Sequence, residues 1–245
     1  MEKIHYKRPP ITEAVIQFVF KSKADNDKIA KAVKKLETLY DKYELREATE
    51  YKFEISPTKE PVTSSKVNPA HEFSSNDRTD VTILRDDSLL CSAIAPYKGW
   101  DEFVSRFERD WKIWRKIVGY KEVEKIGLRY INRIDIPADN PIVRYEDYIN
   151  VFPHVPSVLE PNSYFSINMQ VPLLDIHSLL NIKTAIVKSP VPKHLALILD
   201  LDVVKTFDAP NTDDAYFKYL EAAHTKKNEI FEASIKDKSR ELFQK

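Results

Sequence analysis

Two arginines on one predicted strand are the side chains that most suggest a binding site in this sequence. Arg129 and Arg133 lie in residues 126–137, where apolar and polar residues alternate as in a half-buried β-strand. The alternation places both guanidinium groups on one face of the sheet, and paired guanidinium groups suit phosphate or carboxylate ligands. Glu13, on the first predicted strand, would lie beside them if the two strands are neighbours. The alternative, which we favour, is a structural ion pair between Glu13 and Arg129 or Arg133.

Two aspartates and one asparagine complete the set of candidate site residues. Asp200 and Asp202 emerge from the same face of a leucine-rich segment, and such a pair can hold a divalent cation through oxygen ligands. A solvated sheet face, or salt bridges to Arg129 and Arg133, is the alternative interpretation. Asn132 falls on the apolar face of its strand, where a buried amide needs partners, most simply backbone groups. A shared polar layer of these residues is the place to look for a site.

Several familiar catalytic and cofactor-binding motifs are absent from this sequence. Its three glycines, Gly99, Gly119 and Gly127, are too far apart for a dinucleotide fingerprint or a P-loop. The histidines are too dispersed for a local zinc-binding pair, and no Gly-x-Ser-x-Gly elbow occurs. The single cysteine, Cys91, lies in a predicted strand and is expected to be a small core residue. The sequence therefore predicts no catalytic residue and no cofactor.

The composition is that of a globular protein without a dominant charge. Lys+Arg and Asp+Glu both number 38 among the 245 residues, so nothing suggests a global electrostatic footprint for nucleic acid. No apolar run is long enough for a membrane helix, and the first residues lack the apolar stretch of a signal peptide, so we expect a cytoplasmic protein. Basic residues are predicted on the outer sides of two helices and are expected to be solvated: Lys112, Arg115, Lys116, Lys226 and Lys227.

The predicted strands and helices that would position these residues occur in the same order in both halves of the chain. In the first half we predict a strand over residues 12–20, a helix after Asp25 with apolar positions extending to Tyr43, and a short strand over 51–55. Residues 56–76 are rich in Pro, Ser, Thr and Asn and are predicted to be a loop. A hairpin over 81–95 and a helix over 100–118 complete this half.

The second half is predicted to repeat the order strand, helix, three strands, helix. Strands are expected over 124–136, 164–174, 182–188 and 194–204, a short helix over 145–151 within a loop over 137–162, and a long helix after Thr212. The fold class is therefore α+β, a largely antiparallel sheet with helices on one face and an internal duplication. We expect a single domain over residues 1–245 with pseudo-halves 1–120 and 121–245.

Three motifs resemble those of a sporadically distributed prokaryotic family of similar length that has no established activity. They are Tyr6-Lys-Arg-Pro9-Pro10-Ile11-Thr-Glu13-Ala14-Val15, Gly127-Leu-Arg129-Tyr-Ile-Asn132-Arg133-Ile134, and His224 followed by Phe231. The resemblance implies a bacterial or archaeal source and an accessory role, such as in defence or toxin–antitoxin loci. It implies no catalytic residue.

The leading functional hypothesis is a non-enzymatic binding module that engages a protein partner, or a second copy of itself, through a sheet face or loop edge. The alternative is a phosphate- or nucleotide-handling protein that uses Arg129 and Arg133 with Glu13. Nucleic-acid binding is a third and less favoured hypothesis, and no membrane partner is expected.

Overall fold

The structure, a computed structural model, describes residues 6–46, 49–53, 62–66, 69–138, 143–156, 158 and 164–244. It is α+β with a largely antiparallel sheet, as predicted, and this sheet has nine strands. The chain divides into two compact units: the first comprises residues 1–16, 94–97 and 123–245, and the second comprises 17–93 and 98–122. These units differ from the predicted halves mainly because the first strand contributes residues to both.

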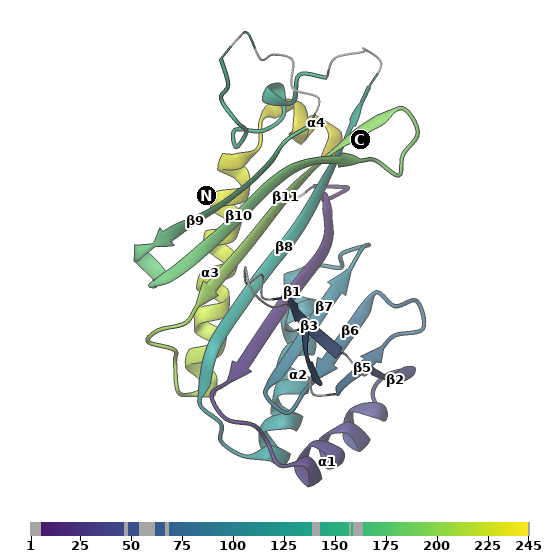
Figure 1. Ribbon diagram of the computed structural model, residues 1–245, viewed down its shortest axis with the longest axis vertical. Coiled ribbons are helices and arrows are strands. Elements are labelled where there is room, and N and C mark those ends of the chain that lie inside the picture. Colours follow the sequence, from purple (N-terminus) through teal and green to yellow (C-terminus); the bar gives the residue numbers. More distant parts are fainter. Residues whose placement is uncertain are drawn as a thin grey trace. The chain divides into compact units, whose positions relative to one another are not determined.

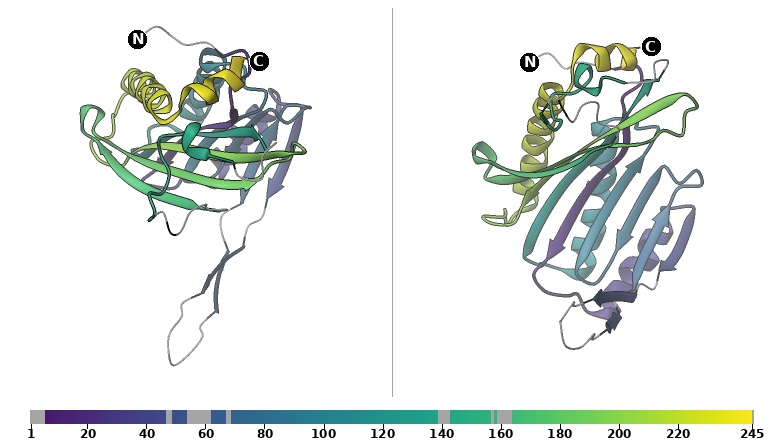
Figure 2. Two further views of the ribbon diagram at one scale, coloured as in Figure 1. Left: turned by 90° about the horizontal axis from the view of Figure 1, so that it is seen from above. Right: turned by 45° about the horizontal axis from the view of Figure 1, so that its top comes forward.

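The first unit contains the strand order β1-β8-β11-β10-β9. The strands are β1 (Ile11–Phe20, up to Ile16 in this unit), β8 (Val123–Pro137), β9 (Ser166–Leu173), β10 (Ser178–Lys188) and β11 (His194–Lys205). Helices α3 (Asp213–Ser234) and α4 (Asp237–Gln244) lie on one side of these strands, as Figure 1 and the left view of Figure 2 show. The short 3-10 helices η1 (Tyr145–Asp147) and η3 (Leu174–Ile176) lie in the connections.

Alternation along β11 explains how this core forms. Leu197, Leu199, Leu201 and Val203 are fully buried on one face, and α3 packs against β11 and β8. Thr212 caps α3 by accepting a hydrogen bond from the Ala215 N–H at 3.3 Å, as its position before two aspartates predicts.

The second unit contains the strand order β2-β5-β6-β7-β1. The strands other than β1 are β2 (Lys42–Arg46), β5 (Ala70–Ser74), β6 (Asp80–Leu84) and β7 (Ser88–Ile94). Helix α2 (Trp100–Val118) lies behind the strands in Figure 1 and packs against α1 (Asn26–Glu37). The predicted aromatic stripe of α2 is confirmed, because Trp111 and Trp114 are fully buried and stack on Phe20. A separate hairpin pairs β3 (Thr49–Phe53) with β4 (Val62–Lys66).

Two predictions about the first half are wrong. The first helix ends at Glu37, so Tyr40 lies in a turn and Tyr43 in strand β2. The predicted loop over 56–76 contains β5, whose Phe73 is fully buried. Both errors have one cause: each of these strands is only five residues long, and its conformation depends on the pairing of β2 with β5 and of β5 with β6 rather than on its own sequence pattern. Residues 56–61 and 67–68 of that loop, and residues 54–55 of the strand predicted before it, lie outside the described residues.

The second half follows the predicted element order closely. The expected helix over 145–151 is a single 3-10 turn, Tyr145–Asp147, and residues 139–142, 157 and 159–162 of the predicted loop are outside the described part of the chain. The strand order supports the duplication: β1-β7-β6-β5 in one unit corresponds to β8-β11-β10-β9 in the other. In each series the strand that comes first in the chain lies beside the one that comes last, β1 beside β7 and β8 beside β11, and β2 is an addition to the first half.

Candidate functional site

Arg129 is held by a bidentate ion pair with Asp200 on the helix-free face of the first unit. Its Nε lies 2.9 Å from Oδ1 and its Nη2 2.6 Å from Oδ2. These hydrogen bonds hold the pKa of Arg129 above its usual value, and the charge of Glu13 adds to this effect. Asp202 faces Arg129 directly in the β8–β11 register, yet the guanidinium group turns to Asp200. The geometry is that of the predicted salt bridge across the sheet.

Arg133 belongs to a second and separate ion pair. Its Nε lies 3.0 Å from Oδ2 of Asp135, two residues along the same strand. The other oxygen of that carboxylate accepts a hydrogen bond from Ser189 at 2.7 Å. Arg129 and Arg133 therefore share a face but not a ligand, because each already donates to its own carboxylate.

Asp202 ends a polar row that crosses three strands. Gln170 on β9 donates to Asn181 on β10 at 2.9 Å, and Asn181 donates to Asp202 on β11 at 3.3 Å. Burial raises the pKa of the Asp202 carboxyl group. Within the described residues, no group of three His, Cys, Asp or Glu side chains could hold a metal ion, and the predicted cation pair of Asp200 and Asp202 therefore has no third ligand of these types there.

Asn132 has the backbone partners that its position on the apolar face predicts. The side chain is 2% exposed, and its Nδ2 donates to the Leu199 carbonyl at 3.0 Å and to the Tyr130 carbonyl at 3.4 Å. Leu199 is also its cross-strand neighbour in the register. The amide therefore joins β8 to β11 and is used for structure rather than for a ligand.

The prediction that Lys227 lies on the solvated side of its helix is wrong. Lys227 is 5% exposed, and its Nζ lies 3.6 Å from the centroid of the Tyr130 ring. It donates to Asn228 at 2.6 Å, and burial lowers its pKa to about 7. The helical spacing contained the signal, because Lys227 falls four residues after buried Ala223 and four before buried Phe231.

A small cluster of titratable groups surrounds this lysine. The Tyr130 hydroxyl group lies 3.0 Å from that of Tyr97, and the ring of His224 lies 6.1 Å from the Tyr130 ring. A neutral amine beside tyrosine and histidine has the chemistry of a general base. Tyr130, however, is fully buried and Lys227 nearly so, which leaves no room for a substrate at the amine. We interpret the cluster as a packed polar contact between α3 and β8.

Three of the other predicted basic residues, Lys112, Arg115 and Lys226, have local partners. Lys112 pairs with Glu108 at 2.7 Å, and Lys226 pairs with Asp175 at 2.5 Å. The guanidinium group of Arg115 lies over the ring of Tyr120. These contacts neutralise or cover much of the charge that nucleic-acid binding would need.

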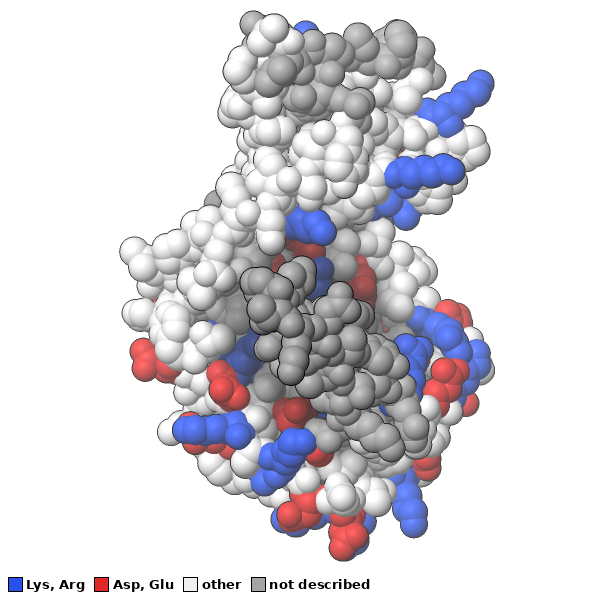
Figure 3. All heavy atoms as spheres, in the orientation of Figure 1, with Lys and Arg blue, Asp and Glu red and all other residues white. Residues whose placement is uncertain are grey.

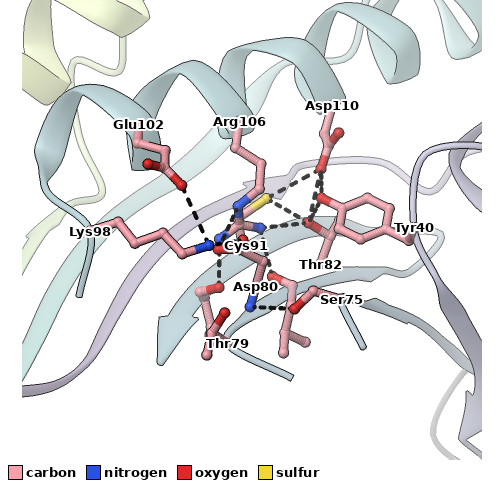
Figure 4. Close-up of polar contacts among 12 residues, drawn as sticks. Tyr40, Ser75, Thr79, Asp80, Thr82, Cys91, Lys98, Glu102, Arg106 and Asp110 are labelled. Carbon is pink, nitrogen blue, oxygen red and sulfur yellow. Dashed lines mark hydrogen bonds and ion pairs between the residues drawn. The ribbon is translucent and has the colours of Figure 1, made fainter. Parts of the chain in front are cut away.

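The second unit contains a buried carboxylate at the centre of a hydrogen-bond network, shown in Figure 4. Asp110 of α2 is fully buried, and its Oδ2 accepts hydrogen bonds from the hydroxyl groups of Tyr40 and of Thr82, the latter at 2.9 Å. Arg109 donates to the other oxygen at 2.9 Å. Arg106 donates to the carbonyls of Val81 and Ser92 and so joins α2 to β6 and β7.

Cys91 belongs to this network but lacks the properties of a nucleophile. It is fully buried, as predicted, and its Sγ lies 3.0 Å from Thr82 Oγ1. Burial, with the negative charge of Asp110, raises the pKa of the thiol to about 12.

We therefore expect Cys91 of the native protein to resist thiol reagents at a pH of about 8, since the thiolate is the reactive form. A colorimetric disulfide reagent should register no thiol until denaturant is added, and one thiol per chain afterwards. Complete reaction of the native protein within minutes would show that the hydrogen-bond network opens readily. It would contradict the conclusion that Cys91 is a buried, unreactive thiol.

The two edge strands of the sheet differ in charge. β2 alternates exposed Tyr43 and Leu45 with Lys42, Glu44 and Arg46, and charged residues of this kind discourage pairing with another chain. β9, with the sequence Ser-Ile-Asn-Met-Gln-Val-Pro-Leu, contains no charged residue. The surface over β9, near the left margin of Figure 3, is correspondingly white.

Apolar side chains are exposed along and around β9. Met169 and Val171 are each 41% exposed, and Tyr164 and Leu174, just outside the strand, are 68% and 79% exposed. Met169 and Val171 face the same side of the sheet as buried Ile182 and Leu180, their partners on β10. The core face of the sheet thus continues onto an edge strand whose apolar side chains remain open among the described residues.

Comparison with known proteins assigns no family to this chain. No protein-family model matches the sequence, and no curated protein matches it significantly. The candidate sites therefore depend on their own geometry. Among the described residues, no helix is long and apolar enough to cross a membrane.

Proposed function

We propose that this chain is a protein-interaction module of a prokaryotic accessory system, active in the cytoplasm, which binds its partner by strand addition at β9. The observation that supports this most directly is the uncharged edge of β9, with Met169 and Val171 exposed on its core-side face. In strand addition, an incoming strand hydrogen-bonds to an open sheet edge while pockets or apolar strips select its side chains. An exposed apolar edge of this length is otherwise an aggregation hazard, which natural proteins normally block with charge.

The backbone geometry of β9 fits this role. The Ile186 N–H donates to the Phe165 carbonyl at 3.1 Å and continues the β9–β10 register by one residue. Hydrogen-bonding positions alternate along an antiparallel strand, so the backbone groups of Ser166, Asn168, Gln170 and Pro172 point to the outer edge. Pro172, which has no N–H to donate, occupies one of these outward positions, where proline is tolerated in sheets.

The phosphate or nucleotide hypothesis has less support. It needs guanidinium groups open to a ligand, whereas Arg129 and Arg133 both donate to carboxylates of the same chain. An entering anion would therefore meet guanidinium groups whose positive charge is already balanced by a neighbouring carboxylate.

We expect photocrosslinking in cells of the native host to test strand addition directly. A photoreactive phenylalanine replacing exposed Asn168 on β9 should give a protein adduct, because an added strand would lie against that position. The matched control places the same photoreactive phenylalanine at exposed Glu44 on β2, where it should give little adduct. Adding Met169→Lys to the Asn168 variant should suppress its adduct. No adduct, or equal adducts at both edges, would contradict the proposal.

A further inference from the structure

Building on the proposed function, we infer that the strand added at β9 is β9 of a second copy of this chain, in an antiparallel pair with a two-fold axis at Met169. The symmetry is available because β9 presents both donors and acceptors outward, and carries no charge that would meet its own copy. A two-fold pair of identical strands needs a sequence that is complementary to its own reverse. β9 meets this requirement in one register.

The outward backbone positions select that register. Placing Met169 opposite Met169 of the second copy pairs Asn168 with Gln170, and each of these residues has both an N–H and a carbonyl to exchange. Pro172 of each copy then lies opposite Ser166 of the other, so its missing N–H costs one terminal hydrogen bond at each end of the pair. A shift of the axis to Gln170 would put Pro172 opposite Asn168 and lose hydrogen bonds nearer to the centre of the ladder.

The side chains favour the same register. On the core-side face, Met169 meets its own copy, and Val171 meets Ile167 of the second chain, so that only apolar side chains face each other. These are the positions that do not exchange hydrogen bonds, where cross-strand side chains approach most closely, with Cβ atoms about 4.5–5.5 Å apart. Shifting the axis to Asn168 would instead bring Val171 opposite Phe165, which is already buried against Tyr145.

The opposite face is compatible with this pairing. It presents Asn168 and Gln170 of each copy, and amide side chains can donate to and accept from one another. Lys183, the partner of Asn168 on β10, is the nearest charged residue on this face in the register and stands one strand back from the interface. The charged edge strand β2 offers no comparable self-pairing, because Lys42, Glu44 and Arg46 alternate along it.

Sedimentation equilibrium over a concentration series tests whether the chain dimerises. The wild-type mass should rise from 28.5 kDa toward twice that value. Met169→Lys should raise the dissociation constant at least tenfold, because it places two like charges opposite each other at the axis. Leu45→Lys makes the same kind of change at an exposed position of β2 and should leave the dissociation constant unchanged. A wild-type mass that stays at one chain throughout would overturn the inference.

A cysteine pair then tests the register. Met169→Cys should form a covalent dimer with oxidised glutathione, since paired Cα atoms at such positions lie about 4.5 Å apart, within disulfide range. Val171→Cys is the matched control, because the two copies of that position would lie about 13 Å apart along the paired strands, beyond that range. Equal crosslinking of the two variants, or none of Met169→Cys, would overturn the two-fold pairing at Met169.

Strand addition at β9 and pairing of β9 with a second copy can be tested separately. If the chain is monomeric in sedimentation while the Asn168 photocrosslinker captures a different protein in cells, strand addition stands and self-pairing is wrong. If the chain is monomeric and no adduct forms at Asn168, both are wrong.

Discussion

Replacing Asp110 with alanine is expected to lower the free energy of unfolding by about 2–4 kcal/mol. The carboxylate is fully buried and accepts hydrogen bonds from Tyr40, Thr82 and Arg109. The hydroxyl groups of Tyr40 and Thr82 lie 2.7 Å apart, so after its removal one can donate to the other, and one buried donor loses its acceptor at a cost of about 1–3 kcal/mol. Arg109 is partly exposed and its guanidinium group can be hydrated, so the loss of its partner lowers the free energy of unfolding by less than the loss of a buried hydrogen bond does. Urea denaturation followed by tryptophan fluorescence measures the change, because Trp111 and Trp114 belong to the same helix.

Two further variants show whether the loss of stability comes from the hydrogen-bond network or from a change in the helix itself. Glu108→Ala, on the same helix, removes a carboxylate that pairs with Lys112 at a partly exposed site, and should change stability by about 0.5 kcal/mol or less. Tyr40→Phe removes a single donor and should cost about 1 kcal/mol. A loss below about 1 kcal/mol for Asp110→Ala would show that the carboxylate is not desolvated as the structure has it.

Replacing Lys227 with methionine is expected to stabilise the protein at pH 7 by about 1–4 kcal/mol. The amine is nearly buried against Tyr130, and no carboxylate forms an ion pair with it among the described residues. Burial lowers its pKa to about 7, and the charge of Glu232 opposes this only in part. Methionine has a similar length and no charge to desolvate. Thermal and urea unfolding at pH 7 measure the gain.

The same substitution should change how stability depends on pH. The unfolded lysine keeps its proton up to a pH of about 10.4, whereas the folded one releases it near 7, so between these values the unfolded state holds one more proton. Lys227 therefore makes stability rise with pH in this window, by up to about 1.4 kcal/mol per pH unit, and contributes no slope below it. Lys227→Met should lack this rise. Lys226→Met, at the neighbouring lysine that pairs with Asp175, is the control and should keep it.

A destabilised Lys227→Met protein with an unchanged pH profile would contradict the assignment. That result would mean that the amine is charged and well paired in the folded state. Burial raises the pKa of Tyr130 and Tyr40 above the usual value of 10.0, so their effects on stability begin near pH 10. Burial also raises the pKa of the Cys91 thiol to about 12, which makes stability fall as pH rises above about 8.5, so the slopes are compared between pH 7 and about 8.5.

The elements with strong periodicity could be predicted from the sequence, and the short edge elements could not. The aromatic stripe of α2 and the alternation in β8 and β11 identify these elements, because each buries one complete face along its own length. β2 and β5 are five residues each, and β2 is exposed throughout. Their strand conformation depends on hydrogen bonds to neighbours distant in sequence, which a local pattern does not contain.

The sequence predicts the face on which the charged residues of β8 and β11 lie and a salt bridge between these strands, but not which carboxylate pairs with each arginine. Alternation places Arg129, Arg133, Asp200 and Asp202 on one face, and all four lie there. Which carboxylate each arginine takes depends on side-chain direction and strand register: Arg129 turns to Asp200 rather than to the opposing Asp202, and Arg133 turns to Asp135. Lys227 was misplaced for a related reason, because charge was given more weight than its position on the buried stripe of α3.

The fold class, the order of the main elements and the faces on which polar residues emerge follow from local patterns in the sequence, since periodicity and turn residues act over a few neighbours. Which strand is an open edge, which charges neutralise each other and which lysine is buried are properties of the folded chain. These depend on contacts between residues far apart in the chain, where the free energy of one group is set by the partner that folding brings to it.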